Sequence, residues 1–348
     1  MSAATPPAAQ SVTLIIVNYN SGARLGRCLD CLSRQTVSGF DIIIVDNASS
    51  DDSLAQADLA ARGVQLIEAG RNAGFAAANN MAAKAAKGEW LALLNPDAYP
   101  EPAWLEALLR AAAHHSETDA FGSRQLDAGD PARLDGEGDV CTIFGVAYRG
   151  GFGHAAEPRG ADGECFSPCA AAALLRRSVF LDLGGFDERF FCYGEDVDFG
   201  FRLRNAGGRA IQVNSAVVLH EGSGVSGRHS GFTLYHGHRN RIWMFYKNMP
   251  ASLYWLTAPL RLVADMALFV KAAAAGEAGA YLKAMRDGYG GLGAFREDRR
   301  KIAALRRKSG AAIAAALCWS PVKFLRREAD LRPLGDADPS AASEQQSS

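Results

Sequence analysis

The run VTLIIVNY at residues 12–19 is the first of four short apolar segments that decide the fold. The others are FDIIIVDN (40–47), VQLIE (64–68) and EWLALLN (89–95), and successive starts lie 28, 24 and 25 residues apart. Each interval has room for one crossover helix, and the spacers have helical patterns at 22–35, 53–62 and 75–87. Runs this apolar are typical of a parallel sheet covered by helices on both faces. We therefore expect an α/β unit of the nucleotide-binding type.

Polar residues follow these strands where each one ends. Asn18 and Tyr19 end the first, Asp46 and Asn47 end the second, and Asp97 lies in ALLNPDAYP (92–100) after the fourth. Such a sheet binds ligands at the carboxyl ends of its strands. Asp46 fits a turn or helix N-cap, but a carboxylate here could also accept a hydrogen bond from N3–H of uracil or thymine.

The stretch FFCYGEDVDFGFRLRNAGG (190–208) places three carboxylates among aromatic residues: Glu195, Asp196 and Asp198. Acidic residues in the first turn of a helix interact favourably with its dipole, which is one interpretation. The other is catalysis, because aromatic neighbours desolvate a carboxylate and raise its pKa toward that of a general base. We favour catalysis.

Three further motifs are ambiguous when taken singly. His220 ends the apolar run AVVLH and precedes a Gly/Ser-rich segment of the kind that forms a mobile lid. It could therefore be a structural residue at a strand end or a ligand in the site. Arg239 in HGHRNR (236–241) could bind a diphosphate or face solvent. GRNAGFAAANN (70–80) has a glycine loop before a helix but lacks the Lys-Ser/Thr of a P-loop.

Composition and charge set the wider limits. The 348 residues are 48% apolar and 22% charged, which suits a soluble α/β domain with a smaller addition. Net charge is −1, but residues 241–348 carry 17 Lys and Arg against 10 Asp and Glu, so the remainder carries −8. The seven cysteines lack zinc-site spacing and predict buried thiols in a reducing cytoplasm. The first ten residues do not resemble a signal peptide.

Taken together and in order, these motifs resemble family 2 glycosyltransferases of the GT-A fold, in the rhamnosyltransferase-like branch. The resemblance covers about residues 11–250. It rests on IVNYN (16–20), VDNASSDDS (45–53), NAGFAAANN (72–80), LLNPDA (93–98), GGFDERFFCYGEDVDFGFRLRNAG (184–207), LHEGSGVS (219–226) and HRN (238–240). It implies a Rossmann-like, mostly parallel sheet with a C-terminal helical extension.

The resemblance also assigns roles. Asp196 would be the base that deprotonates the acceptor hydroxyl, oriented by Glu195, and Asp97 and His220 would bind Mg²⁺ or Mn²⁺. Arg239 and Asn240 would contact the donor diphosphate, and Asp198 and Tyr193 the transferred sugar or the acceptor. The remaining candidates would place the nucleotide: Asn18, Tyr19, Asp46, Asn47, Arg71, Asn72 and Asn79.

One departure from the family concerns the cation. Most members have a DxD motif, whereas Asn95 stands here in place of the first Asp. Because an amide is neutral, we expect weaker cation binding. Rhamnosyltransferase-like members often show this NPD, which favours dTDP-L-rhamnose as donor, with a UDP-sugar as the alternative. One base and one displacement imply inversion at the anomeric carbon.

The acceptor would be a glycan or lipid-linked saccharide in cell-surface polysaccharide or O-antigen synthesis, and we expect no nucleic-acid partner. Residues 251–330 are helical and basic, which suits peripheral binding to the anionic inner face of the cytoplasmic membrane. A packed subdomain or a dimer contact would also explain them. Pro259, Arg261 and Asp265 interrupt the roughly 20 apolar residues that a spanning helix needs. Residues 1–10 and 331–348 have the composition of disordered tails.

Two rivals belong to other classes. A nucleotidyltransferase would need a phosphate-binding loop after the first strand, and VNYNSG (17–22) has none. An inactive sugar-binding scaffold would keep the fold and lose the chemistry, but Asp97, Asp196 and His220 are all present. The oligomeric state stays open.

Overall fold

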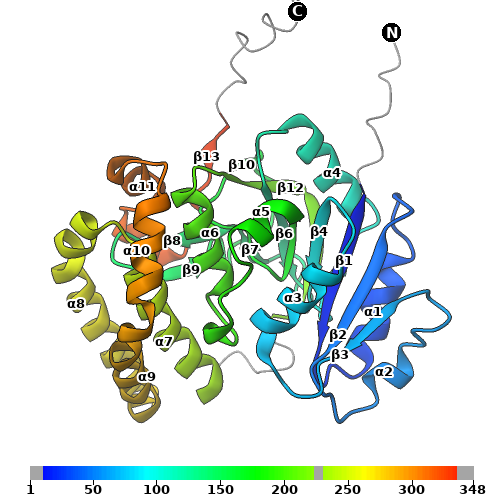
Figure 1. Cartoon of the computed structure of the whole chain (residues 1–348), viewed down its shortest axis with the longest axis horizontal. Coiled ribbons are helices and arrows are strands. Elements are labelled where there is room, and N and C mark those ends of the chain that lie inside the picture. Colours follow the sequence, from blue (N-terminus) through cyan, green and yellow to red (C-terminus); the bar gives the residue numbers. More distant parts are fainter. Residues whose placement is uncertain (1–10, 223–229, 335–348) are drawn as a thin grey trace, which may run out of the picture.

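The four apolar runs of the first hundred residues form neighbouring strands of one sheet in the computed structural model (Figure 1). The structure describes residues 11–222 and 230–334. The strands are β1 (Val12–Asn18), β2 (Asp41–Asp46), β3 (Gln65–Glu68) and β4 (Trp90–Leu94). They pair in parallel, as predicted, and the structure gives their order as β4-β1-β2-β3. The crossovers contain α1 (Ala23–Leu32), α2 (Ser53–Gln56) and α3 (Gly74–Ala85).

One predicted crossover helix is wrong in extent. The pattern at 53–62 predicts a helix of ten residues, but α2 has four, and turns follow it. Asp58 adopts a φ of 45°, which an α-helix cannot accommodate.

The sheet continues beyond β4 with strands of both directions. Its order is β13-β10-β12-β6-β11-β4-β1-β2-β3, with β5 on β12 and β7 on β6. β11 is antiparallel to both β4 and β6, whereas β6 and β12 are parallel to each other. The additional strands are β5 (Ala98–Pro100), β6 (Ala120–Asp127), β7 (Leu134–Glu137), β10 (Gly163–Glu164), β11 (Ala172–Arg176), β12 (Ala210–His220) and β13 (Arg332–Pro333). A separate hairpin consists of β8 (Asp139–Cys141) and β9 (Ala147–Arg149).

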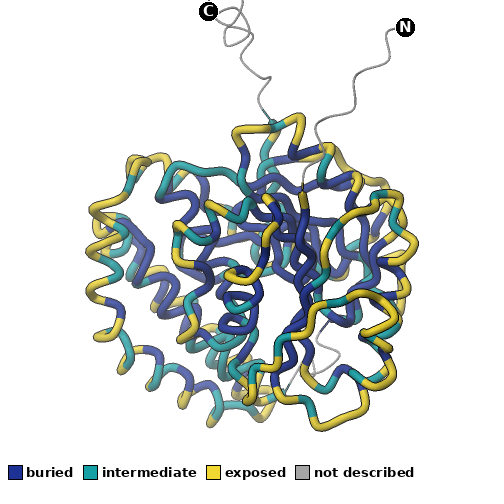
Figure 2. The backbone as a smooth tube through the Cα atoms, turned by 45° about the vertical axis from the view of Figure 1, so that its right-hand side comes forward, coloured by how far each residue is buried: buried dark blue, intermediate teal, exposed yellow. Residues whose placement is uncertain are grey.

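Both faces of the sheet are buried, as the apolar runs predict (Figure 2). Leu14 and Ile16 of β1 pack in one core cluster with α1 and α4 (Trp104–His114), while Ile15 and Val17 pack in the other with α3. The second cluster also includes residues of α5 (Arg177–Asp182) and α6 (Glu195–Asn205). A sheet buried on both faces leaves its strand ends as the natural place for polar ligands.

The C-terminal part is helical and packs on the end of the sheet domain that carries α6 (Figure 1). Its helices are α7 (Gly231–Asn248), α8 (Ala251–Ala274), α9 (Ala278–Gly290), α10 (Arg296–Leu305), α11 (Gly310–Ala316) and α12 (Pro321–Arg326). Phe190 and Phe201 share a third cluster with Trp243 and Phe295. The tail predicted from residue 331 begins too early, because Arg332–Pro333 pairs with β10; the other predicted tail residues lie outside the described ones.

Within the described residues, α8 alone is long and apolar enough to cross a membrane by length and composition. Only 17% of its most apolar window is buried. Core helices of soluble proteins and signal sequences also meet the criterion of length and composition.

Candidate functional site

Asn18 and Asp46 meet at the carboxyl ends of β1 and β2. Asn18 Nδ2 donates to Asp46 Oδ1 at 2.9 Å, and both residues are buried. Ser49 supplies two further donors, its hydroxyl to Asp46 Oδ1 at 2.6 Å and its backbone N–H to Oδ2 at 3.0 Å. A carboxylate offers about four acceptor positions, and the described residues occupy three of them, two on Oδ1 and one on Oδ2. Asp46 is therefore a rigidly oriented acceptor with capacity for one more donor.

The loop before α3 is tied to this edge by Asn47. Asn47 Nδ2 donates to the carbonyl of Gly74 at 3.2 Å, and its Oδ1 accepts from Ala73 N–H at 3.4 Å. Asn72 Oδ1 accepts from Gly74 N–H, while Asn79 Nδ2 donates within α3 to Phe75. Asn47 and Asn79 are buried, so they shape this edge from within. The exposed candidates at the edge are Tyr19, Arg71 and Asn72.

Pairing of β5 with β12 brings Asp97 beside His220. Ala98 lies opposite His220 in the antiparallel register, so the preceding Asp97 reaches the imidazole. His220 Nε2 lies 3.3 Å from Asp97 Oδ1, and Nδ1 lies 2.7 Å from Asp135 Oδ2. All three residues are buried. Burial lowers the pKa of His220, but the carboxylates of Asp135 and Asp97 more than offset this and leave it raised.

The donor set of Asp97 and His220 fits a divalent cation. His220 Nε2 is buried and lies 3.3 Å from Asp97 Oδ1, and no hydrogen-bond partner is found for it among the described residues. A carboxylate on the other ring nitrogen is the usual arrangement behind a metal-binding histidine, because it holds the proton on Nδ1. Asp135 takes that place here. Asn95, the residue at the first DxD position, is half-buried on the same turn and its backbone N–H donates to Ala171.

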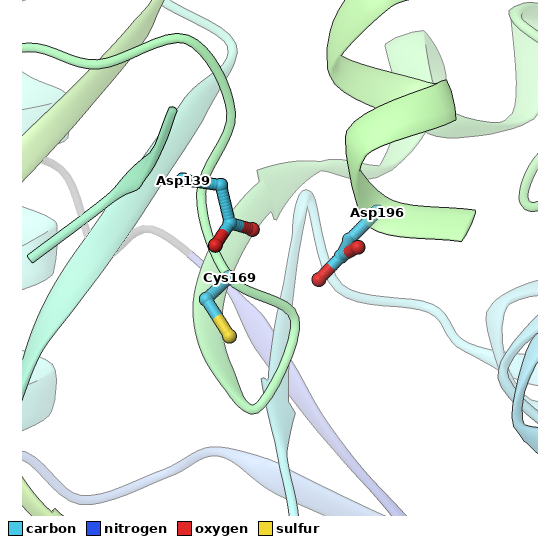
Figure 3. A group of neighbouring side chains, drawn as sticks. All are labelled: Asp139, Cys169 and Asp196. Carbon is cyan, nitrogen blue, oxygen red and sulfur yellow. The ribbon is translucent and has the colours of Figure 1, made fainter. Parts of the chain in front are cut away.

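A second group of side chains lies around Asp196, at the first turn of α6 (Figure 3). Asp139 of β8, Cys169 and Asp196 point toward one another, with one ligand atom of each within 4.8 Å of the others. Arg149 pairs with Asp139 in the β8–β9 register. Its Nη1 donates to Asp135 and lies 3.5 Å from His220 Nδ1. Arg149 thus joins the Asp97–His220 pair to the Asp196 group.

The carboxylates of this group have raised pKa values. Burial is the main cause for Asp196, opposed by hydrogen bonds from the N–H groups of Ala170 and Val197. Burial also raises the pKa of Asp139, and the charge of Asp196 raises it further. Glu195 has its pKa raised by burial and by Asp196, and its Oε2 has no hydrogen-bond partner among the described residues. An acceptor hydroxyl would find in Asp196 a base stronger than an ordinary aspartate.

The loop before Asp196 has an unusual backbone that other motifs support. Phe191, Tyr193 and Gly194 have φ values of 65°, 72° and 83°, and non-glycine residues in this region signal strain at functional sites. Asn240 Nδ2 donates to the carbonyls of Phe190, Cys192 and Tyr193 at 2.7–2.9 Å.

Gly74 supports the same loop from α3. A Cβ on Gly74 would lie 2.6 Å from Phe191, and the neighbouring Ala76 N–H donates to the Phe191 carbonyl at 3.2 Å. Gly74 and Asn240, far apart in sequence, therefore fix the approach to the candidate base.

Two of the four predicted sugar or diphosphate contacts are fully buried and bonded to other parts of the protein. Asn240 is fully buried and holds the loop, so it has no surface for a diphosphate. Asp198 is fully buried as well, with Arg202 and Lys247 at 2.9 Å and Asn248 at 2.7 Å. Its predicted sugar contact is corrected to a structural role.

Arg239 and Tyr193 retain partial exposure. Arg239 Nη2 donates to the carbonyl of Phe190 at 3.2 Å, and the guanidinium stacks 4.1 Å from the Trp243 ring. A diphosphate contact would require Arg239 to leave these partners. Tyr193 Oη lies 3.3 Å from Thr233 Oγ1. The predicted lid after His220 falls mostly on residues 223–229, outside the described ones.

Comparison with known proteins connects this geometry to a family. Residues 13–184 match the model of glycosyl transferase family 2. The N-acetylglucosaminyl-diphospho-decaprenol L-rhamnosyltransferase of Mycobacterium tuberculosis is 31% identical over 71% of this chain and 87% of its own length. This chain belongs to glycosyl transferase family 2. It is a glycosyltransferase of the rhamnosyltransferase-like branch.

One more relative and two solved structures extend the comparison. The O-antigen biosynthesis protein RfbC of Myxococcus xanthus is 34% identical over 43% of the glycosyltransferase and 12% of its own length. The mannosyltransferase PcManGT of Pyrobaculum calidifontis, solved with GDP-Man and Mn²⁺, has a TM-score of 0.52 at 20% identity over 90% of this chain and 86% of that one. GalNAc-T7, solved with UDP, GalNAc and Mn²⁺, has a TM-score of 0.55 at 16% identity over 72% and 53%. These structures confirm the predicted GT-A fold.

Sequence reasoning missed three polar residues of the glycosyltransferase site: Asp135, Asp139 and Arg149. The segment LDGEGDVC (134–141) carried a signal, since acidic residues alternate at every second position as along a strand. Acidic residues that alternate on buried strands need a cationic partner. Arg124 is that partner for Glu137 and Arg149 for Asp135, but the hairpin that brings Arg149 to Asp139 could not be derived from the pattern.

Proposed function

We propose that this glycosyltransferase moves L-rhamnose from dTDP-L-rhamnose to a lipid-linked saccharide, with inversion at the anomeric carbon. The observation that carries the donor and acceptor is the similarity to the Mycobacterium tuberculosis rhamnosyltransferase, whose name states a diphospho-decaprenol acceptor. A cell-surface polysaccharide is the expected product class, and the cytoplasmic face of the membrane is the expected place of reaction.

Asp196 is the proposed base. Its half-buried position and raised pKa suit a carboxylate that accepts a proton from an acceptor hydroxyl. The acceptor oxygen forms its bond to the anomeric carbon while the bond from that carbon to the diphosphate oxygen breaks. The hydroxyl proton passes to Asp196, and the nucleoside diphosphate leaves with the electron pair. Glu195 directly precedes the base in the first turn of α6.

Asp46 is the proposed contact for the pyrimidine. Its remaining acceptor position on Oδ2 suits one N–H donor, and N3–H of thymine or uracil is such a donor. Adenine has no ring N–H donor, so an ADP-sugar is disfavoured, whereas N1–H of guanine is a donor of the same kind. The contact does not separate dTDP from UDP, and a UDP-sugar is the alternative donor.

Asp97 and His220 are the proposed cation ligands, with Asp135 behind the imidazole. A bound Mg²⁺ or Mn²⁺ would neutralise charge that develops on the leaving diphosphate. We expect weak affinity because Asn95 contributes no charge to this edge.

The test compares two aspartates on one helix. Asp196→Asn should lower turnover of dTDP-L-rhamnose by roughly 10²- to 10⁴-fold while donor binding stays within a few-fold of wild type. The matched control, Asp198→Asn, removes a buried carboxylate two residues away and should destabilise the fold without a comparable loss of turnover per folded molecule.

The outcomes separate the alternatives. Transfer from UDP-sugars alone would keep the enzyme class and overturn the rhamnose donor. Unchanged turnover in Asp196→Asn would overturn the base. Absence of transfer and of binding with all nucleotide sugars, in a folded sample, would favour the inactive scaffold.

A further inference from the structure

Helix α8 has the reverse of the polarity that a helix on a water-exposed surface shows. Its buried residues include Thr257, Arg261 and Asp265, which recur every four positions and so share one face. Its exposed residues are large and apolar: Trp255 (73% exposed), Leu256, Leu260, Leu262 (68%), Val263, Met266 and Val270. In a water-exposed helix the apolar face is the buried one. The outer face of α8 is therefore suited to an apolar environment.

The polar face of α8 is bonded to the protein. Asp265 Oδ1 accepts from Arg241 of α7 at 2.6 Å, and its Oδ2 accepts from Tyr289 at the end of α9 at 2.8 Å. Tyr281 donates to the Asp265 backbone carbonyl at 2.8 Å. A helix that crossed the bilayer would have to break these buried bonds or carry the packed domain with it. The contacts favour a helix that lies along a surface, about 36 Å in length at ~1.5 Å per residue.

The charge of the C-terminal helices indicates which surface this is. Between residues 251 and 334, ten exposed side chains are Lys or Arg and one, Glu297, is acidic. A second copy of the chain would bring two such basic regions together, whereas an anionic lipid surface complements them. The apolar face and the basic excess thus fit the same partner.

We propose that α8 docks the glycosyltransferase on an anionic bilayer, with its Trp255–Val270 face inserted at the level of the headgroups and upper acyl chains. This rests on the proposed function only in that a lipid-linked acceptor would be presented there. Helix α8 and strand β3 lie at opposite ends of the long axis of the molecule, so docking leaves the β1–β3 end free in the aqueous phase (Figure 1).

The experiment is vesicle co-sedimentation of the full chain, with phosphatidylcholine vesicles alone or mixed with phosphatidylglycerol, at low and high salt. Leu262→Glu should weaken binding to the mixed vesicles by roughly 10-fold or more, since it replaces an inserted apolar side chain by a charge. The control Leu66→Glu changes the same residue type on exposed β3, at the far end of the molecule, and should bind like wild type.

Tryptophan emission supplies a second measurement, which requires no substitution in α8. Trp255 and Trp319 are the exposed tryptophans among the described residues, so in Trp319→Phe the exposed signal comes from Trp255. We expect a blue shift when mixed vesicles are added and its reversal at high salt.

Each contrary result has a distinct meaning. Binding without a blue shift, or equal binding of Leu262→Glu, would overturn insertion of α8. Equal binding to both vesicle types would overturn the anionic partner. A wild-type dimer in sedimentation velocity that Leu262→Glu dissociates would assign the face to a second copy. The assay contains no nucleotide sugar or acceptor, so an inactive chain would still bind and the two proposals fail separately.

Discussion

Asn240→Ala tests whether the HRN motif acts on the donor or on the loop before the base. The substitution removes an amide whose Nδ2 donates to three main-chain carbonyls, those of Phe190, Cys192 and Tyr193, at 2.7–2.9 Å. Each net hydrogen bond contributes about 1 kcal/mol, and a buried carbonyl left without a donor costs about 1–3 kcal/mol. Two N–H groups serve the three carbonyls, and water can enter the space of the lost amide. We therefore expect a loss of about 2–4 kcal/mol in the free energy of unfolding.

The same change should lower kcat more than it raises the KM for the donor, because the loop at Phe191–Gly194 positions Asp196. Urea unfolding gives the stability, and initial rates over a range of donor concentrations separate kcat from KM. Asn248→Ala is the matched control, since Asn248 is equally buried on α7 and donates to Asp198 and the carbonyl of Met244. It should destabilise to a similar extent and leave kcat per folded molecule unchanged. A stable Asn240→Ala with weakened donor binding would refute this reasoning and restore the diphosphate contact.

Three further predictions concern the base, its loop and the cation. Asp196 must be ionised to accept a proton, and burial raises its pKa. In a pH–rate profile, kcat/KM should therefore fall on the acidic side with an apparent pKa above the ordinary aspartate value of about 4. An apparent pKa at or below that value would contradict the environment described for Asp196. Gly74→Ala should destabilise by about 1–3 kcal/mol more in urea than Gly70→Ala, since both have positive φ but a Cβ at 74 alone meets Phe191; equal losses would show that the contact is unimportant. Asp97→Asn should weaken the Mn²⁺-dependent thermal shift, with a loss of about 10- to 100-fold or more in cation affinity, and an unaltered Mn²⁺ titration would remove Asp97 from the cation site.

The first half of the fold was predictable because its signals are local. β1, β2, β3 and β4 are apolar runs with helical spacers, and parallel pairing follows from their spacing. The insertion of β11 between β4 and β6 was not predictable, since it depends on pairing between residues that are far apart in the chain. The predicted length of α2 was wrong for a local reason: the alanine-rich run at 53–62 suits a helix, but the chain turns at Asp58.

The candidate site, like the fold, could be predicted from the sequence only in part. Strand-end residues such as Asp46 and Asp97 could be found from sequence, because the end of a buried strand is a recognisable position. The structure does not support the predicted contacts of Asp198 and Asn240, since both side chains are fully buried, and a motif does not show which of its polar side chains face inward. Asp198 is fully buried beside Lys247, whereas Asp196, two positions earlier, points to the Asp139–Cys169 group. Helical geometry separates such neighbours by about 200°, so one of the two must face the core.

The positive charge of Arg149 connects the Asp97–His220 pair with the group around Asp196. Arg149 contacts Asp135 behind His220 and pairs in the hairpin register with Asp139, which lies next to Asp196. A guanidinium does not lose its proton in proteins, so this positive charge persists whatever binds. It counters the mutual repulsion of three carboxylates and lowers the pKa that burial would otherwise give Asp196. Because this fixed cation lies 3.5 Å from His220, it also opposes a divalent ion at the Asp97 edge. If Asp97 and His220 bind the cation as proposed, the neutral Asn95 and the nearby Arg149 would act in the same direction, and both would lower the affinity of this edge for a divalent ion.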